Sequence, residues 1–368
     1  MKITSFKGLA VAAVLSAALI SCKKDTPEVI GVDPTEVAGK YENGFFIINE
    51  GWFGHGTGSV SFYDAASGTL KDSVFQKENV GKGFEPASST VQYGTVFNKN
   101  LYVISKVRGP VVVADAKTMK EVGRIPGSSE YDWRAFVGID ENNGLLSSSD
   151  GVYLVNLKTF KPSAKLLGSK GQMGDMLKTD KYIYTLSQTE GAVIYNVSDL
   201  SVQKKIAGVT MGFVKTPDGK VWFTGGKNLY KSDPVTLETE TIELPFSTYT
   251  TYNAWFSSPI IASTKENAVF MIKLPGGWGG GKEIYKYISG DKSSLDKPFI
   301  TVADKQVFYK KNLGYYAEAD QIVTTTFVEG WGAGSATNNL NIYDAKTGAL
   351  KKTVPFTGYH FPSMFAFH

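Results

Sequence analysis

The clearest pattern along the chain is an alternation of apolar and polar positions within short segments that are separated by turn-forming residues. Residues 59–64 have the sequence Ser-Val-Ser-Phe-Tyr-Asp, with an apolar segment before them and a charged one after them. The first copy consists of an apolar segment, a Glu-Gly-Trp loop at residues 50–52, this alternating segment ending in Tyr-Asp, a turn and a charged segment. The same order recurs near the other end of the chain, in residues 326–331, 340–344 and 348–351. Alternation with a period of two is typical of half-buried β-strands.

Weaker copies of this unit fill the chain between its two ends. They span residues 101–118, 144–160, 182–200, 221–237 and 260–288. Together with the end copies they make seven units, spaced by roughly 35 to 55 residues, which is the spacing of β-propeller blades. None of them has a convincing helical stripe of apolar residues. The pattern therefore predicts an all-β protein, a seven-bladed β-propeller.

The first unit lacks an inner strand upstream of it. The last segment of the chain, residues 361–367, has the sequence Phe-Pro-Ser-Met-Phe-Ala-Phe and has the character of that missing strand. We therefore expect the C-terminal strand to complete the first blade. Such a closure removes free sheet edges, which are prone to aggregation.

The N-terminus predicts export and lipidation. Lys2 and Lys7 precede an apolar stretch that is too short to span a bilayer stably. This stretch ends in Leu-Ile-Ser-Cys. This ending resembles a bacterial lipobox, with Cys22 as the lipidated residue, although an ordinary signal peptide with a chance cysteine is the alternative. We expect a cleaved signal peptide over residues 1–21, a flexible lipidated tether over 22–41 and the propeller over 42–368.

Composition excludes several classes of function. The chain of 368 residues carries a net charge of +4 without clustered basic residues, so nucleic acid is not an expected partner. A single cysteine rules out a disulfide framework, and three histidines without metal-ligand spacing make a catalytic zinc site improbable. The glycine-rich runs lack the lysine of a phosphate-binding loop, and no nucleophile elbow is present. We expect no cofactor and no bound metal.

Aromatic residues gather in the loops that one face of such a propeller would present. Trp52, Trp278 and Trp331 lie in glycine-rich loops, which leave room for a ligand to approach the rings. The same loops and the links between blades complete the predicted ligand-binding set: Trp52, Phe53, His55, Arg108, Trp133, Tyr252, Trp255, Trp278, Trp331 and Tyr359. The alternative is that these rings pack between blades, as we expect for Trp222 inside a strand.

Two glutamates invite a catalytic interpretation. Glu50 and Glu329 each precede a Gly-Trp pair, and a glycosidase needs two carboxyl groups at a defined separation. A structural role, with the acid organising its loop, is the alternative. No catalytic residue is assigned.

The repeat, with its Tyr-Asp strand ends and Lys-Thr turns, resembles the YncE-like, surface-layer-type seven-bladed propellers over residues 42–368. The Asn49-Glu50-Gly51 loop is similar to that of outer-membrane propeller lipoproteins of gut anaerobes, some of which capture cobalamin for a TonB-dependent transporter. The resemblance implies a surface-exposed lipoprotein of the outer membrane that binds a corrinoid and touches the membrane only through its lipid. A position on the periplasmic face is the alternative. A glycan-binding surface lipoprotein and a propeller glycosidase or lyase are the alternatives.

Overall fold

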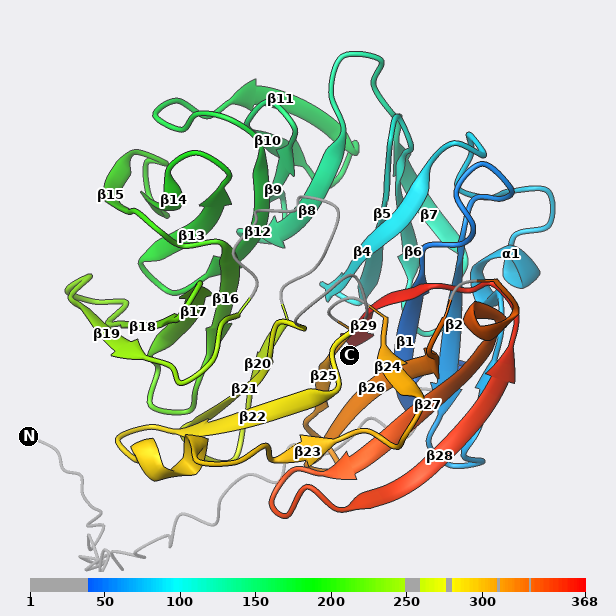
Figure 1. The fold of residues 1–368 in the computed structure, drawn as a ribbon. Helices are drawn as coiled ribbons and strands as arrows, with labels where there is room; N and C mark the ends of the chain where they lie inside the picture. Colours follow the sequence, from blue (N-terminus) through cyan, green and yellow to red (C-terminus); the bar gives the residue numbers. More distant parts are fainter. Residues whose placement is uncertain (1–38, 249–258, 276–279, 310–311, 331) are drawn as a thin grey trace, which may run out of the picture. The chain divides into compact units, whose positions relative to one another are not determined.

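The computed structural model describes residues 39–248, 259–275, 280–309, 312–330 and 332–368, and these residues form seven antiparallel sheets arranged in a ring (Figure 1). The prediction of an all-β, seven-bladed β-propeller is confirmed. From the inner to the outer strand, blade 1 consists of β29 (Pro362–Phe367), β1 (Gly44–Asn49), β2 (Ser59–Asp64) and β3 (Thr69–Lys71). Blade 2 consists of β4 (Thr90–Phe97), β5 (Asn100–Lys106), β6 (Val111–Asp115) and β7 (Glu121–Ile125).

Blades 3 to 5 follow the same up-and-down order. Blade 3 has β8 (Trp133–Gly138), β9 (Asn143–Ser148), β10 (Val152–Asn156) and β11 (Lys161–Lys165). Blade 4 has β12 (Met173–Lys178), β13 (Tyr182–Ser187), β14 (Gly191–Asn196) and β15 (Val202–Ile206). Blade 5 has β16 (Met211–Lys215), β17 (Val221–Gly225), β18 (Asn228–Ser232) and β19 (Thr239–Glu243).

The last two blades are less regular. Blade 6 has β20 (Ile260–Ala262), β21 (Ala268–Ile272), β22 (Glu283–Ile288) and an outer strand of two residues, β23 (Ile300–Thr301). In blade 7 two short strands share the inner position, and the strands are β24 (Gln306–Phe308), β25 (Gly314–Tyr316), β26 (Gln321–Val328), β27 (Thr337–Asp344) and β28 (Leu350–Thr357). The described helices are short: α1 (Val74–Glu78), η1 (Lys292–Leu295) and η2 (Ala333–Ala336).

Ring closure by the C-terminal strand is confirmed. Strand β29 pairs antiparallel with β1, with Phe367 opposite Phe45 and Phe365 opposite Ile47. Both ends of the folded part of the chain therefore share one sheet.

Polar side chains at the ends of the third strands explain the Tyr-Asp and Lys-Thr elements of the repeat. In blade 7, Asp344 Oδ1 accepts hydrogen bonds from the backbone N–H groups of Lys346 and Thr347, at 3.1 and 2.9 Å. The same turn is made at Asp64, Asp115, Asn156 and Asp233. An Asp or Asn that bonds its own backbone two or three residues on stabilises such a turn.

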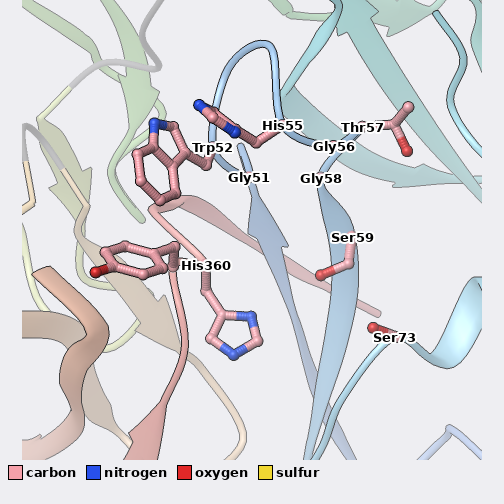
Figure 2. Close-up of a pocket in the computed structure, with 10 residues that line it drawn as sticks. Gly51, Trp52, His55, Gly56, Thr57, Gly58, Ser59, Ser73 and His360 are labelled. Atoms are coloured by element: carbon pink, nitrogen blue, oxygen red, sulfur yellow. The ribbon is translucent and has the colours of Figure 1, made fainter. Parts of the chain in front are cut away.

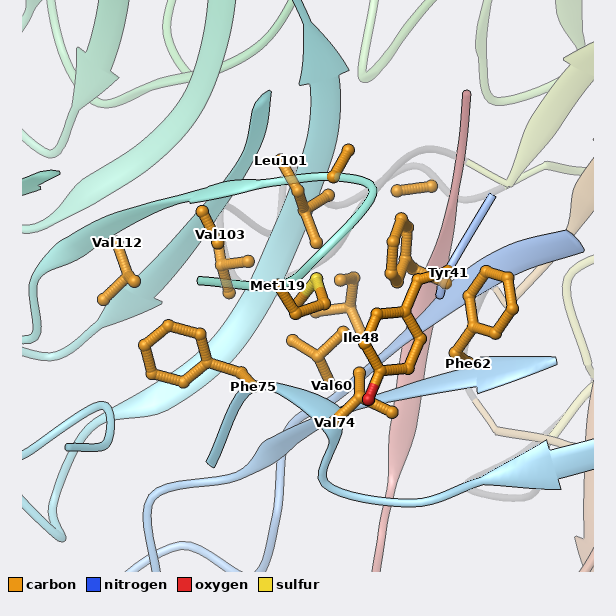
Figure 3. Packing of buried hydrophobic residues seen from close by; sticks show 14 of the residues in the cluster. Tyr41, Ile48, Val60, Phe62, Val74, Phe75, Leu101, Val103, Val112 and Met119 are labelled. Atoms are coloured by element: carbon orange, nitrogen blue, oxygen red, sulfur yellow. The ribbon is translucent and has the colours of Figure 1, made fainter. Parts of the chain in front are cut away.

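The core consists of apolar layers between neighbouring blades. Figure 3 shows the layer between blades 1 and 2, where Ile48, Val60 and Phe62 meet Leu101 and the underside of α1. Alternation places one set of side chains from each strand against each neighbouring blade, so the second strands of the blades are buried on both faces, whereas outer strands such as β11 and β28 are largely exposed.

The packed domain begins slightly before residue 42. Tyr41, which the sequence assigns to the tether, is 2% exposed, packs edge-on against Phe62 and donates a hydrogen bond to Glu78 Oε1 at 2.7 Å. Its backbone N–H also donates to the carbonyl of Lys117 in blade 2. Tyr41 therefore belongs to the core.

The antiparallel order of the strands decides which loops share a face. In each blade, the loop between the second and third strands and the link to the next blade lie at the same end of the strands. We call this end the loop face.

Candidate functional site

The centre of the candidate site is the junction where the chain closes. Beyond the β29–β1 ladder, the backbone N–H of Glu50 donates to the carbonyl of Phe361, and that of Gly51 donates to the carbonyl of His360, both at 2.9 Å. These bonds tie the β1–β2 loop, residues 50–58, to the segment that precedes β29. Side chains from the two ends of the folded chain thus come together on the loop face.

Two glycines close this loop. Gly51 and Gly58 have φ values of 74° and 70°, a conformation that residues with a Cβ rarely adopt. A Cβ on Gly58 would lie 2.4 Å from the carbonyl oxygen of Asn49, and one on Gly51 would lie 2.6 Å from the backbone of Gly58. The two ends of the loop therefore touch, and the residues between them project from the blade.

Three of the predicted site residues form a cluster on this projection, which we call the aromatic platform: Trp52, His55 and Tyr359. The Trp52 ring lies 4.2 Å from the His55 ring and 4.6 Å from the Tyr359 ring, measured between centroids. Trp52 is 46% exposed and Tyr359 is 38% exposed. The neighbouring Phe53 is also exposed. Large apolar rings that remain in contact with water on a folded surface are typical of binding sites.

The platform forms one wall of a cavity of about 360 Å³ (Figure 2). The rest of the lining is polar, with the hydroxyl groups of Thr57, Ser59 and Ser73 and the imidazole of His360. His360 is held by its contacts, because Nε2 lies 3.1 Å from the carbonyl of Thr357 and Nδ1 lies 3.8 Å from Asp72 Oδ1. Apolar rings beside hydroxyl groups suit a ligand with a flat face and polar substituents.

A second group of aromatic residues lies at the loop-face ends of blade 3. In this blade 3 cluster, Tyr131 and Tyr153 stack at 5.1 Å and Trp133 packs edge-on against both. Trp133, a predicted ligand-binding residue, is only 2% exposed, and its Nε1 donates to the carbonyl of Pro126 at 3.1 Å. Trp133 therefore occupies a core position, so we do not include it in the proposed site.

Arg108 lies next to this cluster. It is exposed, adopts a φ of 64°, and its backbone N–H donates to Asp132 Oδ1 at 2.9 Å. The structure places it with blades 2 and 3 and not in the lining of the platform cavity. Tyr252, Trp255, Trp278 and Trp331, and the predicted lipidation site Cys22, lie outside the described residues.

The expectation that Trp222 is a core residue is confirmed. It is 1% exposed, and its Nε1 donates to Thr216 Oγ1 at 2.8 Å.

The two glutamates considered for catalysis occupy unlike environments. Glu50 is 4% exposed and accepts a hydrogen bond from the Tyr309 hydroxyl at 2.8 Å. Burial, together with the negative charge of Glu50 and this hydrogen bond, raises the pKa of Tyr309. Glu329 is exposed and pairs with Lys282 at 2.9 Å. Glu50 thus bonds a buried phenol, whereas Glu329 is a surface ion pair.

Other buried charges were not anticipated from the sequence. Arg134, on the inner strand β8, is 3% exposed and donates to Gln172 Oε1 at 3.1 Å. Lys106, at the end of β5, is also buried. His360 could have been added to the predicted set, because it adjoins Tyr359 in the same link.

The described residues contain neither a metal-binding cluster nor a membrane-spanning helix. No cluster of three or more His, Cys, Asp or Glu side chains could hold a metal ion. Within the same part of the chain, no helix has the length and hydrophobicity needed to cross a membrane.

The fold and the loop-face site define a seven-bladed β-propeller with an exposed aromatic cavity at its closure. The chain belongs to the family described as a domain of unknown function, DUF5074, whose sequence profile matches residues 43–368. No curated protein matches the sequence of this chain.

Solved structures share the architecture. A quinonprotein alcohol dehydrogenase-like protein from Bacteroides thetaiotaomicron is similar at a TM-score of 0.70 and 18% identity, covering 89% of this chain and 78% of that one. A protein from Lactobacillus plantarum has a TM-score of 0.60 and 13% identity, covering 88% and 98%. The dihydro-heme d1 dehydrogenase NirN in complex with DHE has a TM-score of 0.53 and 13% identity, covering 89% and 76%. At these identities the likeness concerns the fold alone.

Proposed function

We propose that the protein binds and captures a small ligand with a flat face on the aromatic platform, and that this ligand is a corrinoid. The observation that carries the proposal is the contact of Trp52 with His55 and Tyr359, at 4.2 and 4.6 Å, on a surface that leaves the Trp52 ring nearly half exposed.

Exposure of these rings is unfavourable without a partner. At about 25 cal/mol for each Å² of apolar surface, covering a ring the size of tryptophan contributes on the order of one to a few kcal/mol to binding. Interblade positions were available to such rings, as Trp222 demonstrates. The loop that carries Trp52 is instead held in a projecting conformation by two glycines at its base.

The choice of a corrinoid rests on two arguments. A corrinoid combines a flat macrocycle with amide-bearing side chains, and the cavity combines aromatic rings with the hydroxyl groups of Thr57, Ser59 and Ser73. The second argument is the resemblance of the Asn49-Glu50-Gly51 loop to that of cobalamin-capturing lipoproteins. In this structure Asn49 is buried, and its Nδ2 donates to Ser61 Oγ at 2.9 Å, which anchors the base of the loop.

The place of action that we propose follows from the N-terminal sequence. Lipidation at Cys22 would tether the propeller to the outer membrane, at the cell surface, where the captured ligand would pass to a TonB-dependent transporter.

Co-elution tests the ligand. The full chain is mixed with cyanocobalamin and passed over a gel-filtration column, and the red chromophore should elute with the protein. Trp52→Ala and Tyr359→Ala should each weaken retention by about tenfold or more, which corresponds to about 1.4 kcal/mol for the loss of a ring contact. The matched control is Val235→Ala, because Val235 is a 66% exposed apolar residue in the turn between β18 and β19, at the opposite end of the strands.

Retention that depends on Trp52 and Tyr359 but not on Val235 supports the proposal. Absence of co-elution at micromolar protein would refute the corrinoid. If a glycan array or affinity gel then gave a signal lost in Trp52→Ala, the platform would be a glycan-binding site.

A further inference from the structure

A second cavity lies on the side of the propeller, away from the closure. It has a volume of about 540 Å³ and is bounded by the outer strand β23 of blade 6 and by the face that blade 7 turns toward it. We call it the lateral groove. Its volume is within the range of small-molecule sites, roughly 300 to 1,000 Å³.

The groove exists because the outer strands of the two blades differ in length. Strand β23 has two residues, whereas β27 and β28 of blade 7 have eight residues each. The outer part of the blade 7 face is therefore left without a covering strand. Alternation along β27 turns Leu340 and Ile342 toward blade 1, where they pack with Phe45, and turns Asn339 and Asn341 toward the groove.

One residue on this face is polar where blades 2 and 4 carry an apolar residue. Three positions before the turn-forming Asp or Asn, blades 2 and 4 carry Val112 and Val193, which are buried in the apolar layers between blades. Blade 7 carries Asn341 there, 8% exposed. Burying an amide is unfavourable unless it is hydrogen-bonded, so this asparagine needs partners.

Asn341 is held in place by two hydroxyl groups. Its Nδ2 donates to Thr326 Oγ1 at 3.0 Å, and its Oδ1 accepts from Thr353 Oγ1 at 2.9 Å. The amide is thereby oriented, and both hydroxyl oxygens retain further hydrogen-bonding capacity because each has two lone pairs.

A second amide pair lies beside it, less tightly joined. Asn339 Nδ2 donates to Gln306 Oε1 at 3.3 Å, near the upper limit for a hydrogen bond. The other polar atoms, Gln306 Nε2 and Asn339 Oδ1, make no hydrogen bond to any residue that the structure describes. The groove thus offers a donor and an acceptor a short distance apart.

The charge and the apolar part of the lining narrow the class of ligand. Among the described residues that line the groove there is no Lys, Arg or His, and Asp304 is the one charged side chain, so an anionic ligand is disfavoured. Phe299 and Leu350 supply apolar surface at the edge, and Leu350 is 55% exposed. A hydroxyl group on a ligand can both donate and accept a hydrogen bond. It can therefore pair with the side-chain amides of the groove and with the carboxylate of Asp304.

We infer that the lateral groove is a second binding site, and that its ligand is a neutral polyhydroxylated molecule, a sugar or polyol. The amides of Asn339 and Gln306 bind its hydroxyl groups, and its C–H face lies against Phe299 and Leu350. This site is independent of the aromatic platform.

Saturation-transfer NMR on the full chain tests the inference, with D-glucose, D-mannose and myo-inositol as separate probes at about 10 mM, where a Kd near 1 mM is readily detected. We expect saturation to be transferred from the protein to at least one of these probes. Asn341→Val introduces the residue of blades 2 and 4, and Gln306→Leu removes an amide from a half-buried position. Each should raise the Kd, obtained by titrating the probe, by about tenfold, the effect of roughly 1.4 kcal/mol. Trp52→Ala should leave it unchanged.

Every other result overturns the inference. These results are no saturation transfer from the wild-type protein to any probe, binding unaffected by Gln306→Leu, or binding lost in Trp52→Ala. If circular dichroism shows that Asn341→Val does not fold, the effect of Gln306→Leu on probe binding alone tests the inference. Cyanocobalamin retention is measured on the same variants. This measurement distinguishes an absence of sugar binding in the lateral groove from an absence of corrinoid binding on the aromatic platform.

Discussion

The aromatic platform and the blade 3 cluster consist of the same kinds of side chain and lie on the same face of the propeller, yet one is open and the other is closed. Trp52 is 46% exposed, whereas Trp133 is 2% exposed. Trp133 begins a strand and is covered by Tyr131 and Tyr153. Trp52 lies in a loop that projects between two close-set glycines. A loop-face aromatic residue is thus a candidate for binding only where the backbone carries it beyond its neighbours.

Hydrogen bonding sharpens the contrast. The indole N–H of Trp133 is bonded to the carbonyl of Pro126, and the Tyr153 hydroxyl donates to Asp150 Oδ2 at 2.9 Å. Trp133 and Tyr153 have therefore satisfied their side-chain polar atoms within the protein, as residues of packed cores do. The platform instead borders hydroxyl and imidazole groups around a cavity.

Deleting residues 359–368 should have the largest effect. The deletion removes Tyr359 and all of β29 with Phe365, leaves β1 without its inner partner, and exposes the layer that contains Phe45. We expect loss of cooperative unfolding in scanning calorimetry, because β1 then has a free edge and blade 1 loses its inner strand. A truncated chain that melts like the full chain would show that closure is dispensable.

Trp133→Ala should come next, as a stability effect. Removing a fully buried tryptophan costs about 3–5 kcal/mol through lost burial and the cavity left behind. Chemical denaturation measures the loss, and Trp133→Phe, which keeps most of the volume, should lose less. Cyanocobalamin retention by the folded fraction should not change. If retention fell while stability did not, Trp133 would be part of the binding site.

Trp52→Ala should give the reverse result. Because the ring is nearly half exposed, we expect the free energy of unfolding to change by less than about 0.5 kcal/mol, the usual range for surface positions. The same denaturation experiment measures this change. A large loss of stability would assign Trp52 to packing between loops and remove the basis of the platform as a ligand site.

Asp150→Asn should have the smallest effect, and one that depends on pH. Burial alone would raise the pKa of Asp150, but hydrogen bonds from Ser148, Lys165 and Tyr153 outweigh it and hold the pKa below its ordinary value. The stabilisation is therefore present at neutral pH and is lost as the pH falls through that lowered pKa. Its side chain is 40% exposed, so screening limits the effect to less than about 0.5 kcal/mol.

The measurement compares melting temperatures of the wild type and Asp150→Asn. The difference should be present near pH 7, decrease once the pH falls below about 4, the ordinary pKa of a free aspartate, and vanish at a lower pH where the Asp150 carboxyl is protonated in the folded protein. A difference that persists at the lower pH would mean that the asparagine disturbs the packing of Tyr153 and not the charge.

Local patterns predicted much of the fold. The Tyr-Asp strand ends predicted both strand and turn, because Asp344 and its counterparts bond to backbone two or three residues away. The ring closure was predictable because the segment 361–367 alternates and the first blade lacked a strand. The division of the inner strand of blade 7 into β24 and β25 was not, since it depends on how Tyr309 and Asn312 pack against neighbouring residues.

The sequence by itself determined the seven repeats, their turns and the completion of blade 1, because these depend on period-two alternation and on hydrogen bonds between residues close in the chain. It also indicated which loops share a face. Only the tertiary structure decided which aromatic rings stay exposed. Trp52 and Tyr359 come from opposite ends of the folded chain and meet through the β29–β1 pairing, whereas Trp133 is covered by its own blade. The lateral groove is likewise a tertiary feature, since it arises from the unequal outer strands of two neighbouring blades.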